Sequence, residues 1–530
     1  MNQYVRFQFV AAAAWTVLAV TASSPTMFGA DPIAVAPARM PRIGTVDERF
    51  QSFNVEMVEV TGGRFWAPYG KSGSAVPEAA PAAKLATPGI DPAAFRTRQP
   101  IDLASPRVRK LASALGPAYV RVSGTWANST YFHDADSPAP ATPPAGFGGV
   151  LTRPQWRGVV DFSHAVNARI VTSFSISDGV RDAKGVWTPD QARKFLAFTK
   201  ASGGSIAAAE FFNEPTFAAM GGAPKGYDAS AYGRDFAVFL TFARKSAPDM
   251  LILGPGSIGE ATPMGAGEMS AVRTQDMLTA TGRGLDAFSY HFYGATSKRC
   301  APMGAAQTTA GAALSQEWLS RTDRDAAFYA GLRDRFEPGK PLWLTETAEA
   351  ACGGNPWAAS FIDSFRYLDQ LGRLAKRGVQ VVAHNTLAAS DYGLIDEATL
   401  TPRPNYWAAL MWHNLMGKTV LDAGTSPAPD VHLYAHCLRD HPGGVALLAI
   451  NTDGGASHDL ATPMPSNRYT LSAQDLLGAR ADLNGSELKL GARDALPSMT
   501  GTPLRAGQVT LAPATITFLA FPDAGNVSCR

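Results

Sequence analysis

Charged side chains are scarce in this sequence, and those of opposite sign nearly balance. Charged residues make up 17% of the 530 positions, and 47 basic against 45 acidic side chains leave a net charge of +2. A basic stripe able to follow a phosphate backbone is therefore missing, so we expect no nucleic-acid partner. Hydrophobic residues, at 46%, suffice for a large core. At this length, one large domain with a smaller second domain is the default expectation.

Long apolar runs are also scarce, and the one candidate lies near the N-terminus. It extends from Phe9 to Val20, follows the cation Arg6 and precedes small residues that end near Ala30. This order is typical of a secretory signal peptide, which we predict for residues 1–30, and the run is shorter than the ~20 residues of a spanning helix. An uncleaved anchor helix is the alternative. The mature chain is predicted to be secreted or periplasmic, without stable membrane insertion after signal cleavage.

Cysteine is rare, with four residues in the whole chain: Cys300, Cys352, Cys437 and Cys529. An even number in an exported chain favours two disulfides, and free thiols are the alternative. Four cysteines permit three pairings, and the spacing alone does not choose among them.

Short apolar runs alternate with helix-like segments over residues 53–417. The alternation predicts a parallel sheet, and eight strands is the number that closes an α/β barrel of the (β/α)8 or TIM type. An open doubly wound sheet is the alternative, but no glycine fingerprint follows the first run. The eight runs lie at residues 52–60, 118–124, 169–176, 206–214, 250–257, 285–293, 341–348 and 379–386.

The pattern changes near Lys418, where short alternating strands separated by turn residues replace the long helical segments. This change predicts a C-terminal antiparallel β-sandwich domain over residues 418–530. Residues 31–52 are expected to form an N-terminal segment able to add a strand to that sandwich. The Pro- and Ala-rich stretch 134–149 is predicted to be an exposed loop.

Two glutamates lie near the ends of predicted barrel strands. Glu214 closes the fourth run, in "EFFNEP", and Glu346 lies in the seventh run, in "LWLTET". Because the carboxyl ends of barrel strands share one face, both carboxylates should meet there. Two carboxyl groups flanking one site suit glycoside hydrolysis, in which one protonates the leaving oxygen and the other attacks the anomeric carbon. Each glutamate taken alone also fits a helix N-cap or a surface charge.

The sequence resembles the heparanase-like β-glucuronidases, glycoside hydrolase family 79, which belong to a large clan of retaining barrel glycosidases. The resemblance begins at residues 111–125, includes "EFFNEP" and "LDAFSYHFY", is closest over residues 342–417, and persists into "LYAHCLRD" and the terminal "VSCR". It implies a retaining hydrolase that cleaves β-linked glucuronic acid from glycans or glycoconjugates. Glu214 would be the acid/base and Glu346 the nucleophile. The resemblance implies no cofactor and no metal.

The same resemblance implies roles for further residues. Arg121 matches the arginine that keeps the nucleophile ionised, although a structural pair with Glu210 is the alternative. Asn213 would contact the sugar 2-hydroxyl, whose hydrogen bond strengthens in the transition state.

Tyr293, with His291 beside it, matches the tyrosine that hydrogen-bonds the nucleophile, and Glu56 and Thr125 match substrate-contacting positions. Tyr392 matches the residue that helps to hold the uronic-acid carboxylate, and a half-buried tyrosine whose hydroxyl is satisfied by the backbone is the alternative. Ser390 would be a substitute donor for that carboxylate.

Two departures from the family pattern bear on the substrate. The loop "NTLAASDY" before Tyr392 is one residue shorter and lacks the glycines whose amides approach the uronic-acid carboxylate. A neutral-sugar glycosidase of the same clan is therefore an alternative, and a non-catalytic carbohydrate-binding protein is another. Residues 258–273 lack the basic cluster of family members that act on sulfated chains, which favours glucuronidase activity over cleavage of a polysulfated polymer.

The resemblance also bears on the cysteines. Cys437 and Cys529 lie in segments that resemble the family's C-terminal disulfide, which implies that they pair. Cys300 and Cys352 are then the second pair, and both are expected in loops on the same face of the barrel, after the sixth and seventh strands.

Overall fold

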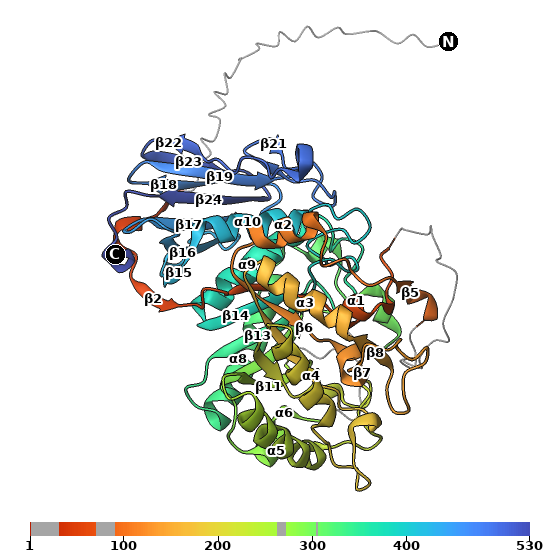
Figure 1. Ribbon diagram of the computed structural model, residues 1–530. Coiled ribbons are helices and arrows are strands. Elements are labelled where there is room, and N and C mark those ends of the chain that lie inside the picture. The colour runs from red at the N-terminus through yellow and green to blue at the C-terminus, as the bar shows by residue number, and fades with distance from the viewer. Residues whose placement is uncertain (2–30, 70–90, 262–271, 304–305) are drawn as a thin grey trace.

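The protein is described here from a computed structural model, which covers residue 1 and residues 31–69, 91–261, 272–303 and 306–530. A helix-covered barrel lies beside a layered β domain (Figure 1). Residues 2–30 of the predicted signal peptide lie outside the described residues, as do residues 262–271 of the stretch without a basic cluster. Within the described ranges, every helix is too short or too polar to cross a membrane.

The barrel is closed by eight parallel strands, in the order β10-β11-β12-β13-β14-β3-β6-β9. A buried layer inside it takes one side chain from each of seven strands, among them Tyr119, Leu253 and Trp343. The predicted TIM barrel is confirmed. Its strands are β3 (Gln51–Asn54), β6 (Ala118–Val122), β9 (Ala168–Ser173), β10 (Ile206–Glu210), β11 (Leu251–Ser257), β12 (Ala287–Tyr293), β13 (Leu342–Ala348) and β14 (Val379–His384).

Helices cover the outside of the barrel (Figure 1). The longer ones are α2 (Pro106–Ala114), α3 (Arg153–Ala165), α4 (Asp190–Ala201), α5 (Ala229–Ser246), α6 (Thr274–Thr281), α8 (Arg321–Phe336), α9 (Asp363–Lys376) and α10 (Pro404–Leu415). Gly378 follows α9 with a φ of 77°, the left-handed conformation that ends many helices.

The first apolar run does not form one long strand. Strand β3 ends at Asn54, and residues Met57–Thr61 form the short helix α1. The Glu59 carboxylate accepts a hydrogen bond from the backbone N–H of Glu56 at 2.7 Å, which satisfies a donor at the start of the helix. The result places the Glu56 side chain at the mouth of the barrel. Strands β4 (Gly63–Trp66) and β5 (Phe95–Arg98) follow and pair in the antiparallel sense.

The second domain consists of two sheets. A nine-stranded sheet has the order β2-β15-β16-β17-β24-β19-β20-β21, with β22 beside β19, and a three-stranded sheet has the order β1-β18-β23. Apolar side chains from both sheets, such as Leu447 and Leu460, form one buried cluster between them. The sandwich strands from the C-terminal part are β15 (Met416–Leu421), β16 (Val431–Leu438), β17 (Val445–Asn451), β18 (His458–Thr462), β19 (Ser466–Ser472), β20 (Asp482–Leu483), β21 (Ser486–Glu487), β22 (Thr502–Leu504), β23 (Gly507–Leu511) and β24 (Thr515–Phe521).

The N-terminal segment joins both sheets of this sandwich. Strand β2 (Arg42–Thr45) pairs with β15 in the antiparallel sense, and β1 (Ile33–Ala34) pairs with β18 in the parallel sense. The predicted antiparallel sandwich is therefore confirmed with one exception, the parallel strand β1.

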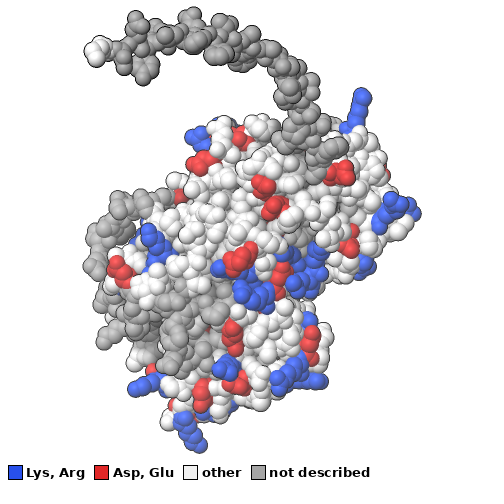
Figure 2. Space-filling view, turned by 180° about the vertical axis from the view of Figure 1, so that it is seen from behind, with Lys and Arg blue, Asp and Glu red and all other residues white. Residues whose placement is uncertain are grey.

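Basic and acidic side chains lie interspersed on the face seen in Figure 2, as expected from the near balance of positive and negative charges in the sequence.

Both predicted disulfides are present. Cys300 and Cys352 are joined with an S–S distance of 2.07 Å, and Cys437 and Cys529 with 2.02 Å. The first bond connects the loops that follow β12 and β13, on the same barrel face as the ends of those strands. Disulfides persist in oxidising compartments, which agrees with the predicted export of the chain.

Candidate active site

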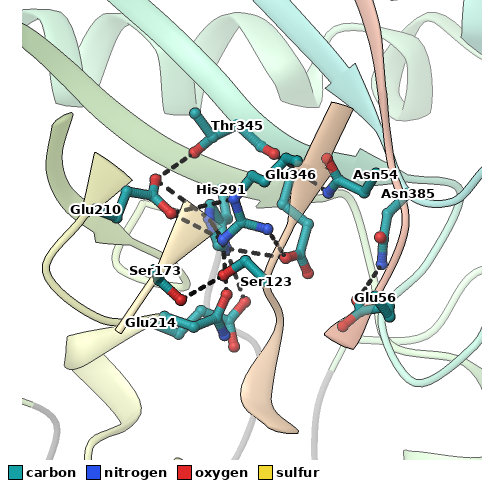
Figure 3. A network of polar contacts seen from close by, with 12 residues as sticks. Asn54, Glu56, Ser123, Ser173, Glu210, Glu214, His291, Thr345, Glu346 and Asn385 are labelled. Atoms are coloured by element: carbon teal, nitrogen blue, oxygen red, sulfur yellow. Dashed lines mark hydrogen bonds and ion pairs between the residues drawn. The ribbon is translucent and has the colours of Figure 1, made fainter. Parts of the chain in front are cut away.

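Side chains from the carboxyl ends of several barrel strands meet in one buried network (Figure 3). Arg121, from β6, lies at its centre and is 1% exposed. Its Nη1 donates to Glu346 Oε2 at 2.8 Å, and its Nη2 donates to Glu210 Oε2 at 2.8 Å and to Asn213 Oδ1 at 2.7 Å. The guanidinium therefore pairs with both glutamates. The structural pair with Glu210 and the predicted contact with Glu346 exist together.

Glu210 is held in its ionised form in this network. Burial alone would raise its pKa, but the Arg121 charge and the hydrogen bond with His291 outweigh burial and hold the pKa well below the usual range. Thr345 adds a donor, since its hydroxyl lies 2.6 Å from Glu210 Oε1. A buried carboxylate with this many donors stays ionised.

Glu346 points from β13 into the opening of the barrel and is 5% exposed. The Tyr293 hydroxyl donates a hydrogen bond to Glu346 Oε1 at 2.8 Å, and Arg121 Nη1 donates one to Glu346 Oε2. Burial and the Glu346 charge raise the pKa of Tyr293 well above its ordinary value, so its hydroxyl remains a donor. Both oxygens of Glu346 accept hydrogen bonds, as a positioned carboxylate does.

Glu214 reaches the opening because β10 ends earlier than the apolar run. The strand stops at Glu210, and Glu214 adopts a φ of 50° immediately before Pro215. This left-handed conformation costs a non-glycine residue about 1 kcal/mol or more and needs support from its surroundings. Asn128 gives that support, since its side chain bonds both the N–H and the C=O of Asn213, at 2.8 and 2.9 Å. Sequence reasoning missed Asn128.

His291 connects the two candidate catalytic carboxyls. Its Nδ1 lies 3.0 Å from Glu214 Oε1 and 3.7 Å from Glu346 Oε2. Burial would lower the pKa of His291, but the Glu346 charge and the bonds to Glu210 and Glu214 raise it to about 9. Its Nε2 lies 3.2 Å from Arg121 Nη2. Both protons of that Nη2 have closer acceptors, so Nε2 can keep its own proton and His291 is an imidazolium at neutral pH.

The pKa of Glu214 is raised. Burial is the main cause, and the Glu346 charge adds to it, while the hydrogen bond with His291 opposes both. Because His291 occupies only Oε1 of Glu214, Oε2 is left for a proton that can be given to a leaving group. A raised pKa is what a general acid requires.

Asn385, just after β14, is a second residue that sequence reasoning missed. Its Nδ2 lies 3.1 Å from Glu56 Oε1, 3.0 Å from Tyr293 Oη and 3.3 Å from Tyr392 Oη. The amide thereby brings Glu56, Tyr293 and Tyr392 together, as Figure 3 shows for Glu56. The available signal was its place as a polar residue at the carboxyl end of a barrel strand.

Thr125 and Ser390 do not join the network. Thr125 begins the short helix η3 (Thr125–Ser129) and is half-buried. The Ser390 hydroxyl donates to the carbonyl of Gly353 at 2.8 Å, and its N–H donates to Glu397 Oε2 at 3.1 Å. Among the residues that the structure describes, neither side chain bonds to the carboxyl groups above. Their contacts with a substrate stay predictions.

Glu214, His291 and Glu346 also present atoms that a metal ion could use, within 4.8 Å of one another. The guanidinium of Arg121 already bonds Glu346 at 2.8 Å and lies 3.2 Å from His291. A second cation in this position would be repelled by Arg121 and by the imidazolium. The charges around these three residues therefore do not favour a metal ion there.

No family model matches the chain. It is 27% identical over 366 residues to Heparanase-like protein 1 of Arabidopsis thaliana, covering 66% of this chain and 65% of that protein. It is 26% identical over 491 residues to a hyaluronoglucuronidase of Hirudo nipponia, covering 81% of this chain and 92% of the relative. In fold it is similar to a GH51 arabinofuranosidase from Xanthomonas axonopodis pv. citri, with a TM-score of 0.58 and 16% identity over 90% of this chain and 97% of the other.

Proposed function

Because the chain belongs to the heparanase-like glycoside hydrolases of family 79, we propose that it is a retaining β-glucuronidase. One observation carries the mechanism: carboxylate oxygens of Glu214 and Glu346 lie within 4.8 Å of each other. Retaining enzymes hold their two carboxyl groups about 5 to 5.5 Å apart, whereas inverting enzymes need about 6.5 to 9.5 Å to admit a water molecule. The spacing supports double displacement.

In the first step, Glu346 attacks the anomeric carbon while Glu214 gives its proton to the glycosidic oxygen. The bond to the leaving group breaks, and a covalent glycosyl-enzyme forms through the Glu346 carboxylate. In the second step, Glu214, now ionised, takes a proton from water. The resulting nucleophile releases the sugar from Glu346, and Glu214 is protonated again.

The surrounding residues orient these two groups. Arg121 and Tyr293 hold one oxygen each of Glu346, which fixes the direction of attack. His291 contacts Glu214 and keeps its free oxygen toward the leaving group. Asn213 is anchored by Arg121 and Asn128, and we assign its amide to the 2-hydroxyl of the sugar.

A panel of chromogenic substrates with one shared leaving group tests the assignment. We expect kcat/KM for the aryl β-glucuronide to exceed that for the β-xyloside and the β-galactoside by about tenfold or more, since a site built for a polar group rejects analogues that lack it. A preference for the xyloside or the galactoside would favour the neutral-sugar alternative. Absence of turnover on the whole panel would favour the binding-protein alternative.

A further inference from the structure

The connection between α1 and α2 contacts loops that follow other strands of the barrel. Its described parts include β4 and β5, which pair with each other, and the ring of Trp66 stacks on that of Phe95 with 4.3 Å between the ring centroids. Phe65 packs in one buried cluster with Val58 of α1 and Ala389 of the loop after β14. The β4–β5 pair is therefore held against a loop from a different barrel strand.

Polar contacts join the same two segments. The Tyr69 N–H lies 3.2 Å from each carboxylate oxygen of Asp391, and Arg98 of β5 faces Glu397 at 3.7 Å. The Glu397 carboxylate also accepts from the backbone N–H of Ser390. The α1–α2 connection is thus attached to the loop after β14 at two separate places.

Arg299, in the loop after β12, extends this assembly to two further loops. Its Nη2 donates to the carbonyl of Ala67 and to Asp391 Oδ2, the latter at 2.6 Å. Its Nη1 donates to the carbonyls of Cys352 and Gly354, in the loop after β13, at 2.8 and 3.2 Å. One side chain therefore joins the α1–α2 connection to the loops after β12, β13 and β14.

The ion pair of Arg299 and Asp391 is buried, with 5% and 8% of the two side chains exposed. The guanidinium carbon of Arg299 also lies 3.9 Å from the centre of the Tyr69 ring, close enough for a cation–π contact. A buried ion pair is costly to break, because either charge alone would stay uncompensated. These segments therefore form a rigid structure, and we call Trp66, Ala67, Tyr69, Arg299 and Asp391 the rim wall.

The rim wall is in close contact with the loop after β13. A Cβ added to Gly353 would lie 2.5 Å from Trp66 Cβ and 2.5 Å from Arg299 Nη1. Gly353 also has a φ of 83°, which favours glycine. The space between the rim wall and this backbone is therefore too small for a further side chain.

Glu346 has different neighbours on its two oxygens. His291 Nδ1 lies 3.7 Å from Glu346 Oε2 and 3.0 Å from Glu214 Oε1. Tyr293 donates to Glu346 Oε1 and lies 3.0 Å from Asn385 Nδ2. Figure 3 accordingly shows Asn385 on the opposite side of Glu346 from Glu214. Asn385 thus marks the side of the nucleophile that is away from the proposed acid/base.

The rim wall lies on the Asn385 side. The Asn385 amide is 3.3 Å from the Tyr392 hydroxyl, and Tyr392 directly follows Asp391 in the chain. Because Glu214 protonates the leaving oxygen, the leaving group lies on the Glu214 side of the sugar. The opposite end of a pyranose ring carries O4, so a sugar attached through O4 would meet the rim wall.

We propose that the rim wall makes this protein an exo-hydrolase, which removes glucuronic acid only from the non-reducing end of a chain. This inference rests on the proposed glucuronidase function and adds the position in the glycan at which it acts. An endo-hydrolase needs a cleft that is open on both sides of its two carboxyl groups. Here a preceding sugar would occupy space that the rim wall fills, and a clash of this kind excludes a competing substrate. Arg299 is a positioning residue, because it acts by holding the rim wall.

Two aryl β-glucuronides test the inference, one with a free 4-hydroxyl and one with a glucosyl unit on O4. The wild type should show a kcat/KM about 100-fold or more lower for the glucosylated substrate, because the added ring clashes with the rim wall. An oligosaccharide of alternating glucuronic acid and neutral sugar, with glucuronic acid at its non-reducing end, should lose that one residue and no more, as measured by mass spectrometry.

Three outcomes of these measurements overturn a claim. Equal kcat/KM values for the two aryl substrates, or shorter oligosaccharides released from within the chain, would overturn the inference and leave glucuronidase activity standing. A wild-type enzyme that does not cleave the unsubstituted glucuronide would overturn both.

Trp66→Ala and Arg299→Gln test whether the rim wall causes the selection. The first removes a large side chain beside Gly353, and the second breaks the buried pair with Asp391. Each should raise kcat/KM for the glucosylated substrate, relative to the unsubstituted one, by about tenfold or more. This ratio does not depend on the fraction of folded enzyme, because both substrates meet the same active molecules. A wild-type ratio in both variants would overturn the role of the rim wall.

Arg181→Gln is the matched control. Arg181 forms a buried ion pair with Asp235 at 2.6 Å, with 6% and 0% of the side chains exposed, and donates to the carbonyls of Ile176 and Gly185 at 2.9 Å each. These are the kinds of contact that Arg299 makes, but they lie outside the rim wall. The ratio should stay at the wild-type value although the free energy of unfolding falls. A change as large as that in Arg299→Gln would attribute the relaxed selection to lost stability and overturn the inference.

Discussion

Replacing Glu346 by alanine is expected to lower kcat for an aryl β-glucuronide by about 10⁴-fold or more, a loss of the size seen when a covalent nucleophile is removed. The reason is that Arg121 and Tyr293 would then face an empty space where the attacking oxygen lay. Added azide should restore part of the rate, because a small anion fits beside the anomeric carbon. The restored product should be the α-glycosyl azide, identified by NMR, since azide attacks from the side of Glu346.

Glu317→Ala is a suitable control for this experiment. Glu317 is an exposed carboxylate on the same barrel, paired with Arg321 at 2.9 Å with 68% of its side chain exposed. Its replacement should leave kcat within about twofold of the wild type, as for most surface substitutions. Near-normal activity in Glu346→Ala, or an azide product in the β configuration, would remove Glu346 from the role of nucleophile.

Arg121→Gln is expected to lower both activity and the free energy of unfolding. Removing one partner of a buried ion pair typically costs about 3 to 5 kcal/mol, because the other charge stays buried without compensation. Here Glu210, which is 0% exposed, would lose two hydrogen bonds from the guanidinium. Urea unfolding monitored by circular dichroism measures the loss. Activity should fall as well, because Glu346 and Asn213 lose their shared anchor.

Arg193→Gln provides the comparison for an exposed pair. Arg193 contacts Asp190 at 2.7 Å, but the two side chains are 58% and 73% exposed, so the change should cost less than about 1 kcal/mol. Adding Glu210→Gln to Arg121→Gln should recover part of the stability, since Glu210 would no longer be a buried charge without a partner. Recovery of activity in that double variant, or a cost of Arg121→Gln no larger than that of Arg193→Gln, would contradict the account of the network.

The barrel was predictable because parallel strands buried on both sides form continuous apolar runs, and such runs are visible in sequence. Glu214 and Glu346 could be found for the same reason, since their runs place them near the carboxyl ends of strands, Glu214 four residues after β10 and Glu346 two residues before the end of β13. The first run was harder, because "VEMVEV" fits either a strand or a helix. Helix α1 is favoured over a strand because the Glu59 carboxylate accepts a hydrogen bond from the Glu56 N–H. Short-range propensity does not reveal this contact.

The residues that sequence reasoning missed act through contacts between distant segments. Asn128 and Asn213 are 85 positions apart in the chain, and Asn385 reaches Glu56 across 329 positions. Nothing in the local sequence distinguishes Asn128 from an ordinary loop residue, and the signal for Asn385 was only its place at the carboxyl end of a barrel strand. Ser390 was predicted to be a donor to the substrate, but its hydroxyl donates to the Gly353 carbonyl. The folded loop sets this orientation, which the sequence alone does not show.

The stereochemistry of the first product tests the central claim most directly. Wild-type enzyme is mixed with an aryl β-glucuronide in deuterated buffer, and the anomeric proton signals are recorded by NMR before mutarotation proceeds. Double displacement through Glu346 inverts the anomeric centre twice, so the account predicts that the β anomer of glucuronic acid appears first. Initial release of the α anomer would mean a single displacement by water and would contradict the assignment of Glu346 as a covalent nucleophile.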